Sequence, residues 1–201
     1  TIYPTFRSYQ KGENMYRTAP IMTLLLLVCL AAYGQQVNID QESSRLTIAG
    51  TSTLHDWTME ATDVQGSATV RKAENILKIS GLTLTVSVKG LESGKNAMDK
   101  NAFEALQYKK YPDITYRLEQ VNGVTNVDGG YLLSTTGTLT IAGKGRRVNM
   151  DVRGSLDGEG YLFSGKLPLK MTDFGVDPPT ALLGSIKTGN EVDIIFNIRY
   201  Q

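Results

Sequence analysis

The chain has 201 residues, enough for one domain of ordinary size together with a processed N-terminal segment. Its 21 basic and 20 acidic residues nearly cancel, and no basic block gathers the Lys and Arg residues, so the sequence argues against nucleic acid as a partner. A single cysteine and a single histidine leave too little material for a disulfide framework or an ordinary zinc site.

The first 34 residues read as an upstream extension followed by a secretory signal peptide. Residues 1–14 precede the first methionine and carry no apolar pattern. Within 15–34, Arg17 supplies the positive start, and residues 21–32 form an apolar run that is too short to cross about 30 Å of hydrocarbon. Small residues at the end of this segment predict cleavage before Gln35, and therefore a periplasmic or secreted protein.

Two other interpretations of the same segment stay open. The apolar run is also compatible with a buried core helix, although its terminal position and its flanks favour the signal peptide. Cys29 is the residue that a lipoprotein signal would modify, but Val28 before it is larger than the residue that such signals prefer. Residues 35–201 then form the predicted mature domain, which has no cysteine.

From Gln35 onward, alternating apolar and polar residues predict short and long β-strands. After a short extended entry at Val37–Ile39, eight strand regions are predicted: Arg45–Thr53, Trp57–Val70, Ile76–Val88, Asp113–Val121, Tyr131–Ala142, Arg146–Leu156, Tyr161–Met171 and Glu191–Tyr200. In the third region the apolar parity shifts by one residue across Ser80 and Gly81, which predicts a β-bulge. Pro178 and Pro179 mark a connection of about fifteen residues, Asp173–Thr188, longer than most.

One helix interrupts this pattern. Apolar residues recur at helical spacing over Met98–Leu106, with no Gly or Pro among them, and Asn96 is a candidate N-cap. Pro112 stops the helix and pushes Tyr111 into an extended geometry. The apolar face of the helix must cover a neighbour, and the end of a barrel or the edge of a sheet is the expected one.

The predicted fold class is all-β, an eight-stranded antiparallel barrel with one short α-helix. Long antiparallel strands with one apolar face and many Gly corners favour a closed barrel over a sandwich, and eight strands leave room for side chains or one small ligand. Small residues on the predicted inner face, such as Gly50, Ala61, Gly137 and Gly165, are compatible with an open channel or with a flattened barrel.

Catalytic patterns are weak in this sequence. His55 beside Asp56 is compatible with a general base or a polar ligand contact, but a turn residue whose ring caps the backbone explains it as well. No Gly-x-Ser-x-Gly elbow accompanies the histidine, and the Asp-Phe-Gly at 173–175 lacks the other kinase motifs. The sequence therefore predicts a protein with no catalytic residues, no cofactor and no metal.

The order of several short motifs resembles the YceI-like family of exported bacterial proteins with a lipocalin-like barrel. The resemblance spans about residues 37–200 and rests on Gly50-Thr51-Ser52, Trp57, the 98–106 helix, Lys110-Tyr111-Pro112-Asp113-Ile114, Gly137–Gly143, Asp173-Phe174-Gly175 and Gly189-Asn190-Glu191-Val192. The family's Arg-Asp pair at the helix reads Met98-Asp99 here. The resemblance implies that the barrel binds a long-chain isoprenoid lipid or quinone along its axis.

The predicted function is a non-enzymatic exported carrier of an apolar isoprenoid-type lipid, and the alternative is a structural or protein-interaction barrel with a filled core. Peripheral membrane contact and a homodimer are both left open. Residues predicted to line the channel or its lid are Leu46, Ile48, Trp57, Leu84, Val86, Phe103, Leu106, Ile114, Tyr116, Leu139, Val148, Met150, Val152, Phe163, Phe174, Ile194, Phe196 and Ile198. Phe103, Leu106 and Phe174 are expected either to gate ligand entry or to cap the barrel end.

Overall fold

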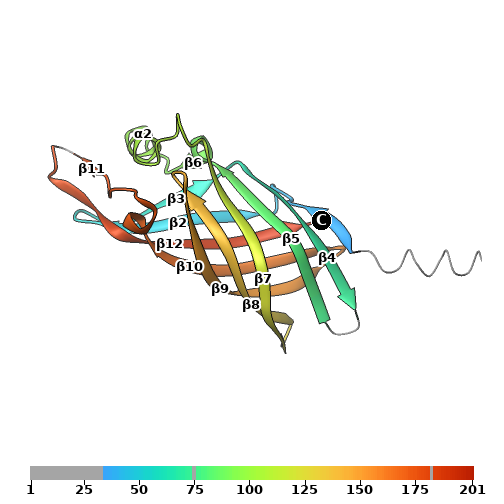
Figure 1. Ribbon diagram of the computed structural model, residues 1–201. Helices are drawn as coiled ribbons and strands as arrows, with labels where there is room; N and C mark the ends of the chain where they lie inside the picture. Colours follow the sequence, from blue (N-terminus) through green and yellow to red (C-terminus); the bar gives the residue numbers. More distant parts are fainter. Residues whose placement is uncertain (1–33, 74–75, 182) are drawn as a thin grey trace, which may run out of the picture. The chain divides into compact units, whose positions relative to one another are not determined.

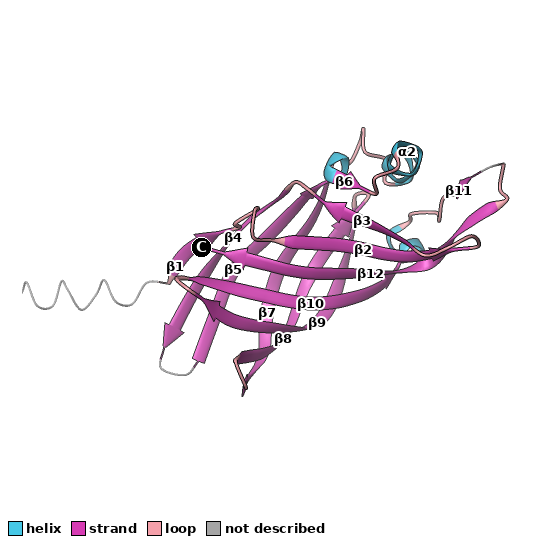
Figure 2. Cartoon of the chain, turned by 180° about the vertical axis from the view of Figure 1, so that it is seen from behind, coloured by secondary structure: helices cyan, strands magenta, loops and turns pink. Residues whose placement is uncertain are grey.

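A computed structural model describes residues 34–73, 76–181 and 183–201, and the predicted extension and signal peptide in residues 1–33 lie outside this part. The described chain is a strongly curled antiparallel sheet with one α-helix (Figures 1 and 2). Its strands are β1 Gln35–Asn38, β2 Arg45–Ser52, β3 Trp57–Ala61, β4 Val64–Ala73, β5 Ile76–Ser87, β6 Leu91–Glu92, β7 Asp113–Val127, β8 Gly130–Ile141, β9 Lys144–Asp157, β10 Gly160–Lys170, β11 Thr180–Ala181 and β12 Ile186–Tyr200. The helices are α2 (Asn96–Ala105) and two 3₁₀ turns, η1 (Val88–Gly90) and η2 (Met171–Phe174).

The sheet runs in the order β1-β4-β5-β7-β8-β9-β10-β12-β2-β3-β6, with β11 paired to β12. Strand β1 connects β4 with β12: it pairs with β4 on one side, and its C-terminal end contacts the end of β12 on the other. Asn38 and Gln201 exchange two backbone hydrogen bonds of 2.8 Å, and Ile39 bridges to Tyr200. The predicted all-β, lipocalin-like architecture with one helix is confirmed.

The strand count differs from the predicted eight. The predicted region 57–70 is two strands, β3 and β4, separated by a tight turn at Thr62 and Asp63. The turn contains no Gly or Pro, so the sequence carried little signal for it. The further short strands β1, β6 and β11 have two to four residues each, too few to show a period.

The predicted bulge in β5 is confirmed. Ser67 pairs with Thr83 and Thr69 pairs with Ser80, so β5 carries one residue more than β4 over this stretch. Gly81 lies there with φ of +61°, a left-handed conformation that glycine adopts without the Cβ penalty. The extra residue keeps the apolar side chains on the inner face on both sides of the bulge.

The helix also forms where the sequence placed it, but Asn96 is its first residue rather than its cap. Lys95 precedes the helix and makes no side-chain capping hydrogen bond. The chain entering the helix is held instead by Asp99, whose carboxylate accepts hydrogen bonds from the backbone N–H (2.8 Å) and the hydroxyl (2.5 Å) of Ser93. The helix ends well before Pro112, as predicted.

The expected loop 173–188 is largely ordered by a hairpin. η2 occupies its start, and β11 then pairs with the first residues of β12, Thr180 with Lys187 and Ala181 with Ile186. The loop is therefore an extension of β12 folded back on itself, and it lies at the same end of the sheet as α2 (Figures 1 and 2).

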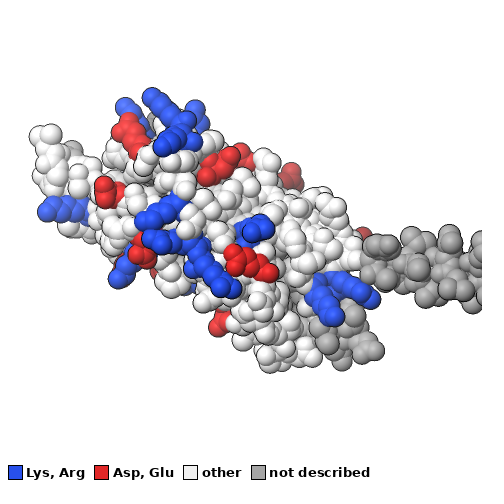
Figure 3. Space-filling view, in the orientation of Figure 1, with Lys and Arg blue, Asp and Glu red and all other residues white. Residues whose placement is uncertain are grey.

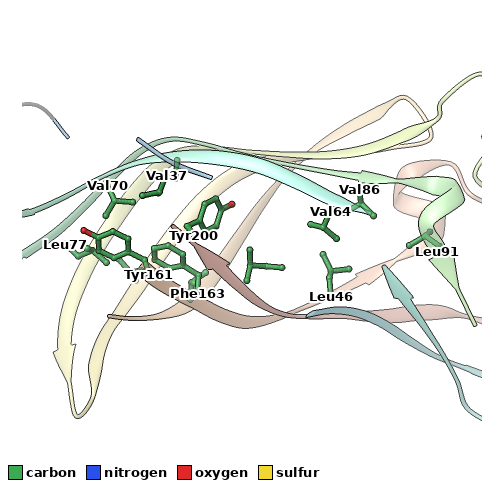
Figure 4. Packing of buried hydrophobic residues seen from close by; sticks show 14 of the residues in the cluster. Val37, Leu46, Val64, Val70, Leu77, Val86, Leu91, Tyr161, Phe163 and Tyr200 are labelled. Atoms are coloured by element: carbon green, nitrogen blue, oxygen red, sulfur yellow. The ribbon is translucent and has the colours of Figure 1, made fainter. Parts of the chain in front are cut away.

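The two ends of the curled sheet are packed differently. At the end where β1 joins β4 and β12, Val37, Val70, Leu77 and Tyr200 are 0–1% exposed and fill the interior (Figure 4). Outside this packed end, Arg199 forms ion pairs with Asp40 (2.9 Å) and Asp157 (3.0 Å) and so joins β12 to the β1–β2 loop and to the end of β9. Toward the end that carries α2 and the β11–β12 hairpin, a smaller buried cluster of Leu139, Ile141, Leu167, Phe174 and Val176 packs beside an interior that stays partly empty.

Candidate functional site

A single elongated cavity occupies the inside of the curled sheet and has a volume of about 470 Å³. It extends from Tyr200 and Ile198 near the packed end to Leu54, Lys95 and Pro179 at the opposite end, which we call the mouth. Its walls are almost entirely aliphatic and aromatic side chains. Both its size and its character are those of a site for a small apolar molecule, for which pockets of about 300–1,000 Å³ are typical.

The alternation of residues along each strand places nearly all of the predicted channel residues on this wall. Leu46, Ile48, Trp57, Leu84, Val86, Leu106, Ile114, Tyr116, Leu139, Met150, Val152, Phe163, Phe174, Ile194, Phe196 and Ile198 line the cavity. That each of them contacts a ligand stays a prediction.

Val148 and Phe103 do not line the cavity, contrary to the prediction. Val148 is half-buried and packs against a separate cluster around Leu139 and Phe174. Phe103 lies on a different face of α2 from the residues that line the cavity, and its ring centroid is 5.9 Å from that of Tyr108. Helical spacing identifies an apolar stripe but not which part of the stripe faces the lumen, and the choice between a lid and a cap for Phe103 stays a prediction.

The cavity stays open because its aromatic rings lie over glycines of the neighbouring strand. Trp57 covers Gly50, its direct partner across β2 and β3, so closely that the ring occupies the position of a Cβ atom. Phe196 covers its partner Gly165 in the same way, and a Cβ added at Gly165 would lie 2.6 Å from Cζ of Phe196. The space above Gly50 and Gly165 is therefore not empty, since each of these glycines is covered by an aromatic ring.

Tyr116 lies across Gly137 on β8 in a similar arrangement. Its hydroxyl oxygen is buried and has no hydrogen-bond partner among the described residues. Burial raises the pKa of Tyr116, the charge of Glu119 raises it further, and the hydroxyl of Thr135 lowers it. Burial raises the pKa of Tyr200 as well, with Tyr116 contributing, so both phenols stay neutral at physiological pH.

Polar side chains reach the cavity mainly at the mouth, among them Ser52, His55, Lys95 and Asn101. His55 does not stand as a free base: its Nδ1 lies 2.6 Å from the backbone oxygen of Asp56, and the hydroxyl of Ser52 donates to the backbone oxygen of His55 (2.7 Å). The histidine is thus part of an ordered turn between β2 and β3. Its position at the rim agrees with both the turn and the ligand-contact interpretations.

Sequence reasoning missed a further part of the wall. Leu133, Leu167, Leu169 and Tyr200 line the cavity and follow the same alternation as neighbours that were predicted, so the signal was present. Residues of the β2–β3 loop and the β11–β12 hairpin gave no such signal, because they lie in turns where no period exists.

Within 34–73, 76–181 and 183–201, no three His, Cys, Asp or Glu side chains gather in a way that could hold a metal ion.

Across the same ranges, none of the helices combines the length and the apolar character needed to traverse a membrane.

Comparisons with solved structures identify similar folds. The crystal structure of Burkholderia cenocepacia BcnA matches with a TM-score of 0.63 and 21% identity, covering 80% of this chain and 98% of that one. A polyisoprenoid binding domain from Saccharophagus degradans, implicated in plant cell wall breakdown, matches with a TM-score of 0.63 and 14% identity, covering 82% and 97%. A mutant of the Campylobacter jejuni YCEI protein matches with a TM-score of 0.52 and 20% identity, covering 68% and 80%. At these identities the likeness concerns the fold.

A search of curated proteins found no match. The sequence itself, however, matches the YceI-like domain over residues 37–200, which is nearly the whole described chain. The match spans every strand that lines the cavity, together with α2 and the hairpin at the mouth. The chain therefore belongs to the YceI-like family.

Proposed function

We propose that the protein binds one apolar, isoprenoid-type lipid in the cavity and carries it without chemical change. The observation that carries this proposal is the elongated apolar cavity of about 470 Å³, plugged at one end and reached from the other. Each methylene that leaves water for such a wall gains about 0.8 kcal/mol, so a long chain needs few polar contacts to bind tightly. The alternative of a barrel with a filled core receives no support from this interior.

The isoprenoid class is suggested by the family and by a structural relative. The Saccharophagus degradans domain with the same fold is described as polyisoprenoid binding. A methyl-branched, flexible chain also suits a narrow lumen whose wall is uneven, because Leu, Ile and Met side chains alternate there with flat rings. Transport without catalysis is proposed because the imidazole of His55 is engaged with the backbone of its own turn.

The test is to express the full chain with its own N-terminal segment in a Gram-negative bacterium and purify it without detergent. Native mass spectrometry and organic extraction should then find one apolar lipid for each folded protein. Phe196→Asp should abolish retention, because it places a carboxylate on the apolar wall, where an unpaired charge is very costly. Ile195→Asp is the matched control, since Ile195 is the next residue on β12 but is 43% exposed on the outer face.

Absence of extractable lipid, together with failure of the folded protein to bind a fluorescent isoprenoid, would refute the carrier function. Equal retention by the two Asp variants would show that the lipid binds elsewhere.

We also propose that the carrier works outside the cytoplasm. The apolar run that ends before Gln35 supports export, because it has the length and flanks of a signal peptide. N-terminal sequencing of the mature protein should begin at Gln35, whereas a lipid-modified terminus at Cys29 would establish a lipoprotein instead.

A further inference from the structure

We propose that the mouth of the cavity is a docking surface for an anionic lipid bilayer. The proposal rests on the proposed function, because a carrier of a water-insoluble chain must load and unload where that chain resides. Three features of the mouth carry it: two exposed leucines at its tip, four exposed lysines in the segment 95–110 that contains α2, and the opening of the apolar cavity between these elements.

The exposed leucines come from two different connections. Leu54 lies in the β2–β3 loop and is 65% exposed, and Leu183 lies at the tip of the β11–β12 hairpin and is fully exposed. The two connections form one platform, because the backbone N–H of Thr53 donates to the oxygen of Lys187 (3.0 Å) and the N–H of Lys187 donates to the Thr53 hydroxyl (3.1 Å). Large apolar side chains held out at adjoining tips are suited to insertion among lipid head groups.

The charge beside these tips is positive. Lys95, Lys100, Lys109 and Lys110 are all exposed in the segment that contains α2. Figure 3 shows cationic side chains gathered over the end of the molecule that carries α2. The same segment has only two carboxylates, and one of them, Asp99, is engaged by Ser93. Each Lys close to an anionic membrane surface contributes about 1 kcal/mol of attraction, so the four lysines of the segment 95–110, against its two carboxylates, orient the mouth toward acidic head groups.

The cavity opens between these features rather than on another face. Leu54 and Lys95 both line its rim, and Pro179, Ala181 and Ile186 continue the apolar wall onto the hairpin. A bilayer into which Leu54 and Leu183 insert would therefore lie directly over the opening of the cavity. The lipid could pass from one apolar phase to the other without exposing its chain to water, which would cost about 0.8 kcal/mol for each methylene.

The opposite end of the sheet also exposes two leucines, Leu132 (42%) and Leu156 (47%), but neither of them lines the cavity. The interior of this end is filled by side chains that are 0–1% exposed, and the Arg199 ion pairs close it from outside. Leu132 projects from β8 next to Arg153. This residue is the matched control for the tip leucines.

The docking experiment uses ligand-free full-length protein after processing and vesicles of phosphatidylcholine alone or with about 30% phosphatidylglycerol. Flotation should recover the protein with the anionic vesicles and much less with the neutral ones. Raising the ionic strength from about 0.1 M to about 1 M shortens the Debye length from about 10 Å to about 3 Å and should release it. The double variant Leu54→Ser/Leu183→Ser should bind about tenfold or more weakly, whereas Leu132→Ser should bind like the parent.

A second variant tests the charge without touching the tips. Lys100→Gln/Lys109→Gln should weaken binding to anionic vesicles and leave the weak binding to neutral vesicles unchanged, because both side chains are exposed and distant from the packed core. Circular dichroism and urea midpoints verify that every variant is folded.

Three results would refute the docking proposal. The folded parent protein could fail to bind anionic vesicles, or the Leu54→Ser/Leu183→Ser variant could bind them as well as the parent does. The third result is a concentration-dependent dimer of the parent that disappears in the same variant. The last result would make the leucines an interface between two copies. Retention of a preloaded fluorescent isoprenoid is measured separately. Retention without vesicle binding would refute docking alone, and vesicle binding without retention would refute the carrier function alone.

Discussion

Gly165→Ala tests whether a glycine on the cavity wall keeps the lumen open for the ring of Phe196. The added methyl would lie 2.6 Å from Cζ of Phe196, while ordinary contact begins at 3.4 Å. The ring must therefore move by about 0.8 Å or more, and the free direction is into the cavity that Phe196 lines. A ring displaced into the lumen removes space that a lipid chain would occupy.

The expected result is a loss of affinity with little loss of stability. Overpacking in a solid core costs about 1–3 kcal/mol, but here the ring can relax into space, and replacing Gly by Ala gains about 0.4–1 kcal/mol through the unfolded state. Displacing one or two methylenes of the ligand costs about 0.8 kcal/mol each, which corresponds to about a 4- to 15-fold weaker Kd.

Titration with a fluorescent isoprenoid and urea midpoints measure the two quantities. Gly123→Ala is the control, because a Cβ there would meet nothing within 4 Å. Phe196→Leu in the Gly165→Ala background should restore affinity, since the shorter side chain no longer competes for the lumen. Unchanged affinity in Gly165→Ala, or the same loss in the Gly123→Ala control, would refute the idea that the glycine sets the width of the channel.

The remaining predictions concern the lid, a buried hydroxyl and the packed end. Leu106→Ala should speed the release of the isoprenoid, because Leu106 lines the cavity. Phe103→Ala should lower the urea midpoint without changing the off-rate of the isoprenoid per folded molecule. A faster off-rate in Phe103→Ala would show that Phe103 is a lid residue. Tyr116→Phe should leave stability unchanged or raise it by about 1 kcal/mol, since it removes a buried hydroxyl without a partner, and a clear loss of stability in thermal melts would contradict this. Hydrogen bonding from Ser43 and the charge of Arg199 hold the pKa of Asp40 below its ordinary value, so the contribution of the ionised carboxylate is fully present above about pH 4 and is lost as the pH falls through the lowered pKa. Asp40→Asn should therefore lower the urea midpoint at pH 7, and the deficit should shrink as the pH falls below about 4; a deficit that does not change with pH would mean that the charge is not its cause.

The sequence predicted the wall of the cavity well because one physical rule governs it. Alternate residues of a strand share a face, and β10 and the Glu191–Tyr200 part of β12 pair without a register shift, so Phe163 and Phe196 lie on the cavity side as the spacing predicts. The bulge at Gly81 was equally readable, since a parity shift at a glycine has few other causes.

The spacing of residues along the sequence does not predict which residues face each other across neighbouring strands. Gly165 lies opposite Phe196, but the two are 31 positions apart, and only the register of β10 with β12 brings the ring onto the glycine. The positions at which neighbouring strands end likewise determine the turn at Thr62 and Asp63 and the exposure of Leu183. Local periodicity thus predicts the face of a residue, whereas cross-strand register decides whether the lumen is filled or empty.

An open lumen has an energetic consequence for the protein without its ligand. In protein cores, residual cavity volume costs about 24 cal/mol per Å³, so an interior void of about 470 Å³ corresponds to a penalty on the order of 10 kcal/mol, as an upper limit because the mouth admits water. This penalty is as large as the whole stability of an ordinary domain. The plug of Val37, Val70, Leu77 and Tyr200, with the Arg199 ion pairs outside it, has to hold the fold together while the other half stays unfilled.

Under the proposed function, a lipid bound in the cavity would complete the hydrophobic core. Because it binds the folded state and not the unfolded chain, occupancy stabilises the fold by about 2.7 kcal/mol when free ligand reaches 100 times its Kd. Extraction with organic solvent followed by refolding should thus give a protein with a lower urea midpoint, and adding the isoprenoid back should restore it in proportion to its concentration. The Phe196→Asp variant should show no such recovery, since its wall no longer accepts the chain. A midpoint that is equal with and without lipid would mean that the cavity closes when it is empty, and the aromatic rings of the wall would then have to leave their glycines to fill it.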